Sequence, residues 1–453
     1  MNKFIKCISN VVAVCYLLLP ITTHAGELAD YEEAHKFYLA ATACMAAYSD
    51  RVAGFSLDEL DQEGWQAESY VKSSRKADVR FLLSTKIQKS NNQRYYLLAV
   101  VGTENLKDVM TNLLVDKVYF AGSTPEEFEA NAAHKDMANE YPKVHMGYNQ
   151  YVQEALSAEG RDGTGIVKRR LTDMLLEHKE GKLYLVGHSM GGATATLAGA
   201  RLISMGVRAE QVEIITFGSP AVGNEAFRQQ FEPILNVTRI VNDDDPVTGA
   251  MQTLVKGYKQ FGHEVHWHVP NNATVEPHQM TVYLDLATKH YYQKRQQAIQ
   301  AAVMPGLVNQ TATVTGVPKI YVAPIKNSLS AGLQEEFFYM KEALQDEFRR
   351  TLPGYVIDIA QTDEDVFKKA QLAGCQWVLT SEIQENKIKD EQSGYYITLE
   401  QSLQPVGEGN IAKFASYGRS SRKSTPLQAL IHDGRNMSRD SHEWLDALQV
   451  RQK

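Results

Sequence analysis

A serine between two glycines stands near the middle of the chain, directly after an apolar stretch. The segment Gly187-His188-Ser189-Met190-Gly191 follows residues 182–186, which we predict to be a strand, and small residues after it open a helix. So tight a turn brings the residues on either side of the serine into close contact, and glycine removes the Cβ atoms that would clash. Ser189 is therefore predicted to project its hydroxyl from a nucleophile elbow, where the Met190 N–H can donate to a developing oxyanion.

A serine hydroxyl needs a histidine base, and the histidine needs an acid that orients it. In a nucleophile-elbow arrangement these partners follow in the order Ser, Asp or Glu, His. Three adjacent aspartates, residues 243–245, end a predicted strand, and only one of them can face the site. The spacing does not choose among the histidines that follow in the same region of the chain, which are His263, His266, His268, His278 and His290.

The surrounding sequence predicts an α/β fold in two parts. Strand patterns alternate with helical patterns up to about residue 303, which is typical of a parallel sheet with crossover connections. The predicted strands cover residues 77–101, 182–186, 212–217 and 238–241, and the predicted helices residues 31–48, 167–178 and 190–205. Residues 26–303 are thus expected to form one domain. After a linker at residues 304–318, residues 319–453 predict a smaller α/β module.

Four segments resemble the class-three (fungal-type) lipase family of α/β-hydrolases. Residues 185–193 are similar to its nucleophile block, residues 216–224 to the block that follows and residues 144–148 to the block that precedes it. Val101-Gly102-Thr103 resembles the family's oxyanion strand, although Val101 stands where an arginine is usual. Together these motifs cover about residues 30–300, and they imply an α/β-hydrolase domain with a mostly parallel central sheet.

The resemblance also implies roles for single residues. Asp245 matches the acid that opens a D-x-V turn, with Asp244 as its rival, and His278 matches the base a few residues before a tyrosine. Thr103 and Met190 match the oxyanion donors. The implied protein is a serine carboxylic-ester hydrolase of lipase or phospholipase type, which forms an acyl-enzyme and uses no cofactor. The alternatives are a soluble small-ester or feruloyl-type esterase and an envelope scaffold or binding protein with an idle hydrolase fold.

Apolar residues recur at helical spacing just after Thr103, namely at Leu106, Val109, Met110, Leu113 and Leu114. In the lipase family the corresponding segment is a lid over the acyl site, whereas an ordinary core-facing helix would show the same spacing. An opened lid would expose several apolar side chains, at up to ~1.5–3 kcal/mol each, unless a lipid surface covered them. The lid interpretation therefore implies transient contact with a lipid surface.

The composition limits the class of protein, and the N-terminal sequence predicts the compartment in which it works. The chain has 453 residues, and Lys+Arg 47 against Asp+Glu 54 gives a formal charge of −7, an acidic excess that argues against a nucleic-acid partner. Two lysines, an apolar run and small residues before a cut after Ala25 predict a signal peptide over residues 1–25, and hence periplasmic or extracellular export. The sequence leaves open whether Cys44 and Cys375 pair.

Three further features of the sequence give weaker indications. His263-Glu264-Val265-His266 is HExH rather than HExxH, and on a strand only His266 and His268 share a face, so we expect no metal site. His188 is expected to pack or hydrogen-bond within the elbow. Residues 319–453 carry no chemical motif and faintly resemble small periplasmic modules of envelope-assembly proteins. That pattern suggests a docking role and an envelope protein as partner.

Overall fold

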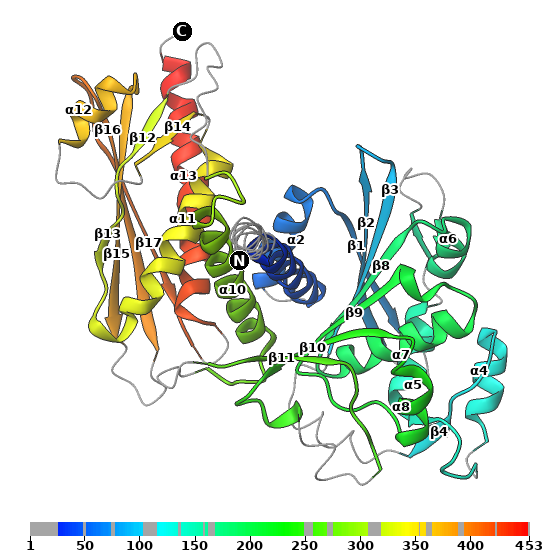
Figure 1. The fold of residues 1–453 in the computed structure, drawn as a ribbon. Coiled ribbons are helices and arrows are strands. Elements are labelled where there is room, and N and C mark those ends of the chain that lie inside the picture. Colours follow the sequence, from blue (N-terminus) through cyan, green and yellow to red (C-terminus); the bar gives the residue numbers. More distant parts are fainter. Residues whose placement is uncertain are drawn as a thin grey trace, which may run out of the picture. The chain divides into compact units, whose positions relative to one another are not determined.

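The computed structural model describes most of the chain: residues 26–48, 51–73, 78–102, 116–134, 137–156, 159–161, 168–248, 257–269, 275–306, 319–352, 354–358, 365–387, 394–421 and 424–451. Contacts divide the chain into two compact units (Figure 1). The first unit comprises residues 35–270 and 277–287, and the second comprises residues 1–34, 271–276 and 288–453. The sequence predicted one domain over residues 26–303, whereas the contacts assign residues 26–34, 271–276 and 288–303 to the second unit.

A seven-stranded sheet forms the centre of the first unit. Its first three strands pair antiparallel and the remaining pairs are parallel, which confirms the predicted α/β class with a mostly parallel sheet. In spatial order the strands are β1 (Gln66–Ser73), β2 (Asp78–Gln88), β3 (Gln93–Val100), β8 (Lys182–His188), β9 (Val212–Phe217), β10 (Asn236–Asn242) and β11 (His263–Trp267).

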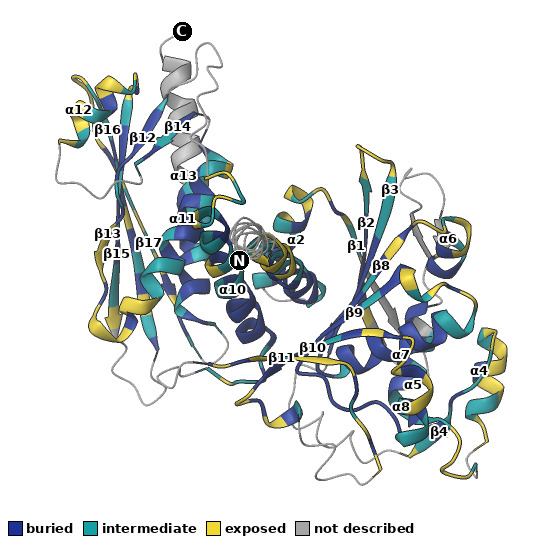
Figure 2. Ribbon diagram, in the orientation of Figure 1, coloured by how far each residue is buried: buried dark blue, intermediate teal, exposed yellow. Residues whose placement is uncertain are grey.

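The helix α7 (Met190–Ser204) packs closely on one face of this sheet, beside α5 (Met146–Leu156). Small residues make the approach possible, since a Cβ on Gly199 would lie 2.5 Å from Cδ1 of Ile214 in β9. Both the central strands and α7 are buried almost throughout (Figure 2). Strands covered on both faces read as continuous apolar runs, which is why the sequence revealed β8 and β9 so clearly.

The opposite face of the sheet carries residues 35–47, the part of an N-terminal helix that belongs to the first unit. Glu213 points away from the α7 side because it precedes Ile214 in β9, and Lys36 of that helix forms an ion pair with it. Phe37 packs edge-on against Trp267 at the end of β11, with ring centroids 6.3 Å apart. The first turns of α10 (Met280–Gln300) lie on the same face, where Tyr283 contacts Phe217.

Shorter elements complete the first unit: α2 (Arg51–Gln62), β4 (Lys117–Tyr119), α4 (Pro125–Ala132), β5 (Lys143–His145), β6 (Glu159–Arg161), β7 (Lys168–Arg170), α6 (Leu171–Glu177), η1 (Ala209–Gln211) and α8 (Glu225–Phe231). The helix predicted over residues 167–178 is therefore wrong at its start. Residues 168–170 are extended and pair with β6, and the backbone of Arg170 (φ −66°, ψ 141°) caps a helix that begins only at Leu171.

The second unit is built on a mixed sheet of the order β14-β12-β15-β16-β17, with β13 pairing β15. Two helices, α11 (Phe337–Thr351) and α13 (Pro426–Arg451), pack against each other, and α13 also packs on β16 and β17. The other elements are β12 (Ile320–Val322), β13 (Lys326–Ser328), η2 (Ala331–Glu336), β14 (Tyr355–Ile357), α12 (Val366–Leu372), β15 (Trp377–Lys387), β16 (Tyr395–Pro405) and β17 (Ala412–Arg419).

Two further observations concern the described residues of both units. Cys44 and Cys375 are both buried and both free thiols. Among the described helices, none combines the length and the apolar character that crossing a membrane requires.

Candidate active site

Ser189 occupies the corner between β8 and α7 in a strained backbone conformation, with φ 57° and ψ −126°. A Cβ on Gly187 would lie 2.2 Å from the carbonyl oxygen of Gly191, and a Cβ on Gly191 would lie 2.1 Å from that of Val100. Only glycine fits either position. The two glycines singled out in the sequence thus allow α7 to start directly against the ends of β3 and β8, with the serine between them.

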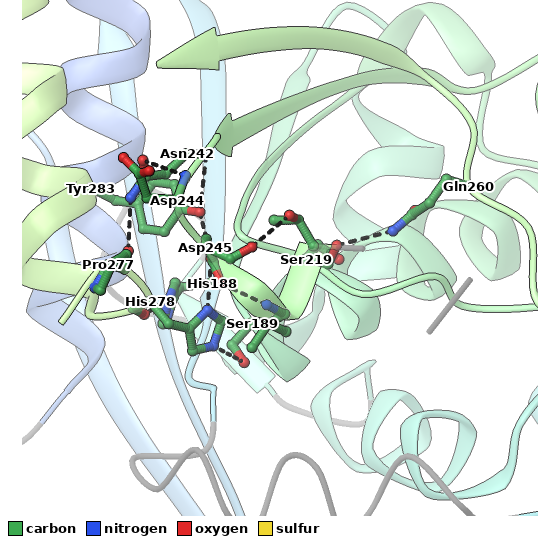
Figure 3. A network of polar contacts seen from close by, with 12 residues as sticks. His188, Ser189, Ser219, Asn242, Asp244, Asp245, Gln260, Pro277, His278 and Tyr283 are labelled. Carbon is green, nitrogen blue, oxygen red and sulfur yellow. Dashed lines mark hydrogen bonds and ion pairs between the residues drawn. The ribbon is translucent and has the colours of Figure 1, made fainter. Parts of the chain in front are cut away.

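Three side chains from distant parts of the sequence meet at this corner (Figure 3). Nε2 of His278 lies 2.9 Å from Oγ of Ser189, and Nδ1 of the same ring lies 2.7 Å from Oδ2 of Asp245. All three residues are buried. The structure therefore brings together the serine, the aspartate and the histidine that the sequence comparison with the lipase family selected.

Asp245 is held as a carboxylate by several donors. Oδ1 accepts a hydrogen bond from the backbone N–H of Val247 at 2.8 Å, and Oδ2 accepts one from the hydroxyl of Tyr283 at 2.7 Å. Burial opposes ionisation of this carboxyl, but the contacts with His278, Tyr283 and Val247 outweigh it and lower the pKa of Asp245. A negative charge next to His278 favours the imidazolium form that proton transfer from Ser189 would create.

The two neighbouring aspartates point elsewhere. Oδ1 of Asp243 lies 2.7 Å from Nδ1 of His266, and Oδ2 of Asp244 lies 3.3 Å from Nδ1 of His268. Of the three acids that the sequence left as alternatives, it is Asp245 whose carboxylate contacts His278. Asp244, the rival candidate, pairs with a partly exposed histidine instead.

His188 makes two hydrogen bonds inside the elbow. Its Nε2 lies 2.7 Å from the carbonyl oxygen of His278, and its Nδ1 lies 2.9 Å from the hydroxyl of Tyr48. Burial, together with the neighbouring His278, lowers the pKa of His188 to about 3, so that the ring is neutral. The sequence predicted that His188 packs or bonds within the elbow, but it gave no indication of these two partners.

The expected oxyanion donors and the lid segment are described only in part. Met190 begins α7 immediately after Ser189. Thr103 and the lid candidates Leu106, Val109, Met110, Leu113 and Leu114 lie outside the described residues. Gly102, the residue before Thr103, lies against the elbow, since a Cβ there would be 2.4 Å from the carbonyl oxygen of His188 and 3.2 Å from Cβ of Ser189.

The histidine-rich segment belongs to β11 and its end. His266 bonds Asp243 through Nδ1 and Glu264 through Nε2, at 2.7 and 3.2 Å. Across the part of the chain that is described, no three His, Cys, Asp or Glu side chains gather as metal ligands would. His266 and His268 thus lie against acids of β11 and of the turn that follows β10.

Part of the chain is similar to known lipases. The family described as "Lipase (class 3)" matches residues 97–254 of this chain. A segment of 77 residues is 40% identical to chloroplastic phospholipase A(1) DAD1 of Arabidopsis thaliana, which covers 17% of each chain. A segment of 107 residues is 33% identical to the secreted mono- and diacylglycerol lipase A of Penicillium cyclopium, 24% of this chain and 34% of that one.

These matches are local. The chain spans about a fifth of the length of the first curated relatives it matches, between 17% and 24%. Among solved structures, a lipase from Rhizopus microsporus var. chinensis overlaps 52% of this chain and 74% of its own, at 20% identity and a TM-score of 0.38.

Proposed function

We propose that this protein is a serine carboxylic-ester hydrolase of lipase or phospholipase type. The proposal is carried by one observation: an unbroken, buried line of hydrogen bonds from Ser189 through His278 to Asp245. The match of residues 97–254 to the class 3 lipases supports it independently. A hydroxyl, an imidazole and a carboxylate at these distances form the constellation that activates serine in otherwise unrelated folds.

The proposed reaction is a double displacement. Oγ of Ser189 attacks the ester carbonyl while Nε2 of His278 takes its proton, and Asp245 holds the ring with Nδ1–H toward the carboxylate. The N–H groups of Met190 and Thr103 would stabilise the oxyanion, where loss of one such donor typically costs ~2.7–4 kcal/mol. The imidazolium then protonates the leaving alcohol. Water, deprotonated by His278, attacks the acyl-enzyme and releases the carboxylic acid together with free Ser189.

Fatty-acyl esters, as in acylglycerols or phospholipids, are the proposed substrates. The names of two relatives point to this class, one being a phospholipase A(1) and the other a mono- and diacylglycerol lipase. The first alternative is an esterase that acts on small soluble esters. The second alternative is an envelope scaffold or binding protein with an idle hydrolase fold. Export through residues 1–25, transient contact with a lipid surface and docking of an envelope protein on residues 319–453 remain predictions.

A panel of substrates tests the proposal. Residues 26–453 are assayed on p-nitrophenyl butyrate, emulsified triacylglycerol and phosphatidylcholine vesicles, with Ser189→Ala as the matched control. We expect hydrolysis and fluorophosphonate labelling by the unaltered chain and neither by Ser189→Ala. A rate that rises once triacylglycerol exceeds its solubility would support the lid. Activity that persists in Ser189→Ala would contradict the proposal, and a chain that neither hydrolyses nor reacts with the probe would favour the idle fold.

A further inference from the structure

The backbone around His278 is held by two side chains that come from strand ends of the central sheet. Nδ2 of Asn242, the last residue of β10, donates to the carbonyl oxygen of Pro277 at 3.0 Å. Nε2 of His188, the last residue of β8, lies 2.7 Å from the next carbonyl oxygen, that of His278 itself. The carbonyls of two consecutive residues are thus both fixed to the sheet (Figure 3).

The hydrogen-bond pattern assigns the tautomer of His188. A carbonyl oxygen only accepts hydrogen bonds, so Nε2 of His188 must carry the proton. Nδ1 is then an acceptor, and the hydroxyl of Tyr48 donates to it at 2.9 Å. The ring is 4% exposed and stays neutral, with its centroid 4.8 Å from that of His278. A neutral ring adds no positive charge next to the imidazolium that forms on His278 during the reaction.

We infer that His188 and Asn242 are positioning residues of the active site: they fix the main chain of residues 277 and 278 and thereby hold the His278 ring between Ser189 and Asp245. The inference rests on the proposed function and goes one step further, because neither residue contacts a reacting atom. His278 precedes α10, and its ring has to reach two partners on different strand ends within hydrogen-bonding distance. A displacement of about 1 Å in such an arrangement costs about a hundredfold in rate.

Asn242 also couples the histidine to the acid. Its backbone carbonyl accepts from the N–H of Asp245 at 2.9 Å, and its backbone N–H donates to the hydroxyl of Tyr283 at 3.3 Å. That hydroxyl in turn donates to Asp245. One buried residue at the end of β10 therefore contacts the turn that bears the acid and the segment that bears the base, so the two are positioned together.

A matched pair of substitutions at His188 tests the inference. In His188→Gln the side-chain amide nitrogen reaches about as far from the backbone as Nε2, so the bond to the carbonyl of His278 can form. In His188→Asn the side chain is one carbon shorter, so the amide nitrogen cannot reach the carbonyl oxygen of His278. Both replacements are polar and both remove the imidazole. The full chain is assayed for kcat and KM on p-nitrophenyl butyrate, and the downfield proton resonance of the His278–Asp245 hydrogen bond is recorded by NMR.

We expect His188→Asn to lower kcat about a hundredfold with KM within about twofold, and to broaden or abolish the downfield resonance. His188→Gln should keep kcat within about threefold of the unaltered chain and retain the resonance. Equal kcat values and equal spectra for the two variants would overturn the inference. The spectrum decides even for a chain without esterase activity, because it reports ring position and not turnover. Failure of the proposed function is thereby distinguished from failure of this inference.

Discussion

The hydroxyl of Tyr283 and Nδ1 of His278 contact the same oxygen, Oδ2 of Asp245, each at 2.7 Å. Tyr283 is fully buried, and burial followed by the charge of Asp245 raises the pKa of its phenol well above the ordinary value. The phenol therefore remains protonated and acts as a permanent donor to the carboxylate. Together with His278 and the N–H of Val247, this donor lowers the pKa of Asp245 against the effect of burial.

Replacing Tyr283 by phenylalanine removes the donor and keeps the ring. A hydrogen bond to a charged group contributes about 1.5–3 kcal/mol. We expect Tyr283→Phe to lower kcat on p-nitrophenyl butyrate about tenfold or more, since the carboxylate is less well held opposite His278. Tyr417→Phe, at a ring that is 74% exposed in the second unit, is the control and should be neutral. An unchanged kcat for Tyr283→Phe would show that the bond has no part in positioning Asp245.

The adjacent aspartates offer a second matched pair. Asp245→Asn replaces the acceptor of the Nδ1–H proton by an amide that favours the wrong tautomer of His278, which costs about 10⁴ in kcat in serine hydrolases of this constellation. Asp244→Asn should stay within about threefold, because Asp244 pairs with partly exposed His268. Measuring kcat for both variants identifies the acid, and the reverse order of effects would assign that role to Asp244.

The backbone of Ser189 predicts a stability effect that is separate from catalysis. A residue other than glycine at φ 57° and ψ −126° costs of order 1–3 kcal/mol. Ser189→Gly and Ser189→Ala should both be inactive, but the glycine variant should melt a few degrees higher than the alanine variant, since only glycine relieves the strain. Differential scanning calorimetry compares them. Identical melting temperatures would mean that the corner is not strained in solution.

Asp433 in α13 predicts a pH dependence of stability. The side chain is fully buried, and burial raises its pKa to about 7, against hydrogen bonds from Ser416 and Gly418. Between about pH 4 and 7 the unfolded chain has lost this proton while the folded chain keeps it, so the free energy of unfolding falls as the pH rises through that window.

Asp433→Asn cannot ionise and should lack this contribution. We expect the drop in melting temperature from pH 5 to pH 8 to be smaller by a few degrees than in the unaltered chain. Exposed Glu408 provides the control, because Glu408→Gln should leave the drop unchanged. The prediction fails if Asp433→Asn and Glu408→Gln show the same pH dependence.

The sequence predicted the nucleophile corner from local chemistry alone. Glycines two positions either side of Ser189, between a strand and a small-residue helix, are required by contacts of 2.1–2.2 Å that a Cβ would make. The proposed base, His278, could not be found in this way. Seven histidines follow Ser189, five of them before residue 303, and the one that meets it lies just before α10 in a segment without a periodic pattern.

Several elements escaped prediction for physical reasons. β1 is an edge strand with a polar sequence, QAESYVKS, so it lacks the alternation that marks a half-buried strand. β17, which lies at the edge of the second unit's sheet, also escaped prediction. α13 could have been found, because Leu427, Leu430 and Met437 are buried at helical spacing. Asn242 and Tyr48 carry no motif, and their hydrogen bonds appear only once distant segments are folded together.

The short segment of residues 277–287 returns to the first unit after residues 271–276, which belong to the second. It carries both His278 and Tyr283, whereas the family match stops at residue 254. An expression clone trimmed to that match would retain Ser189 and Asp245 yet lack His278, the proposed proton acceptor. Fragments for expression should therefore extend at least through Ala287. A shorter fragment would be inactive because it lacks His278, and its inactivity would say nothing about the full-length protein.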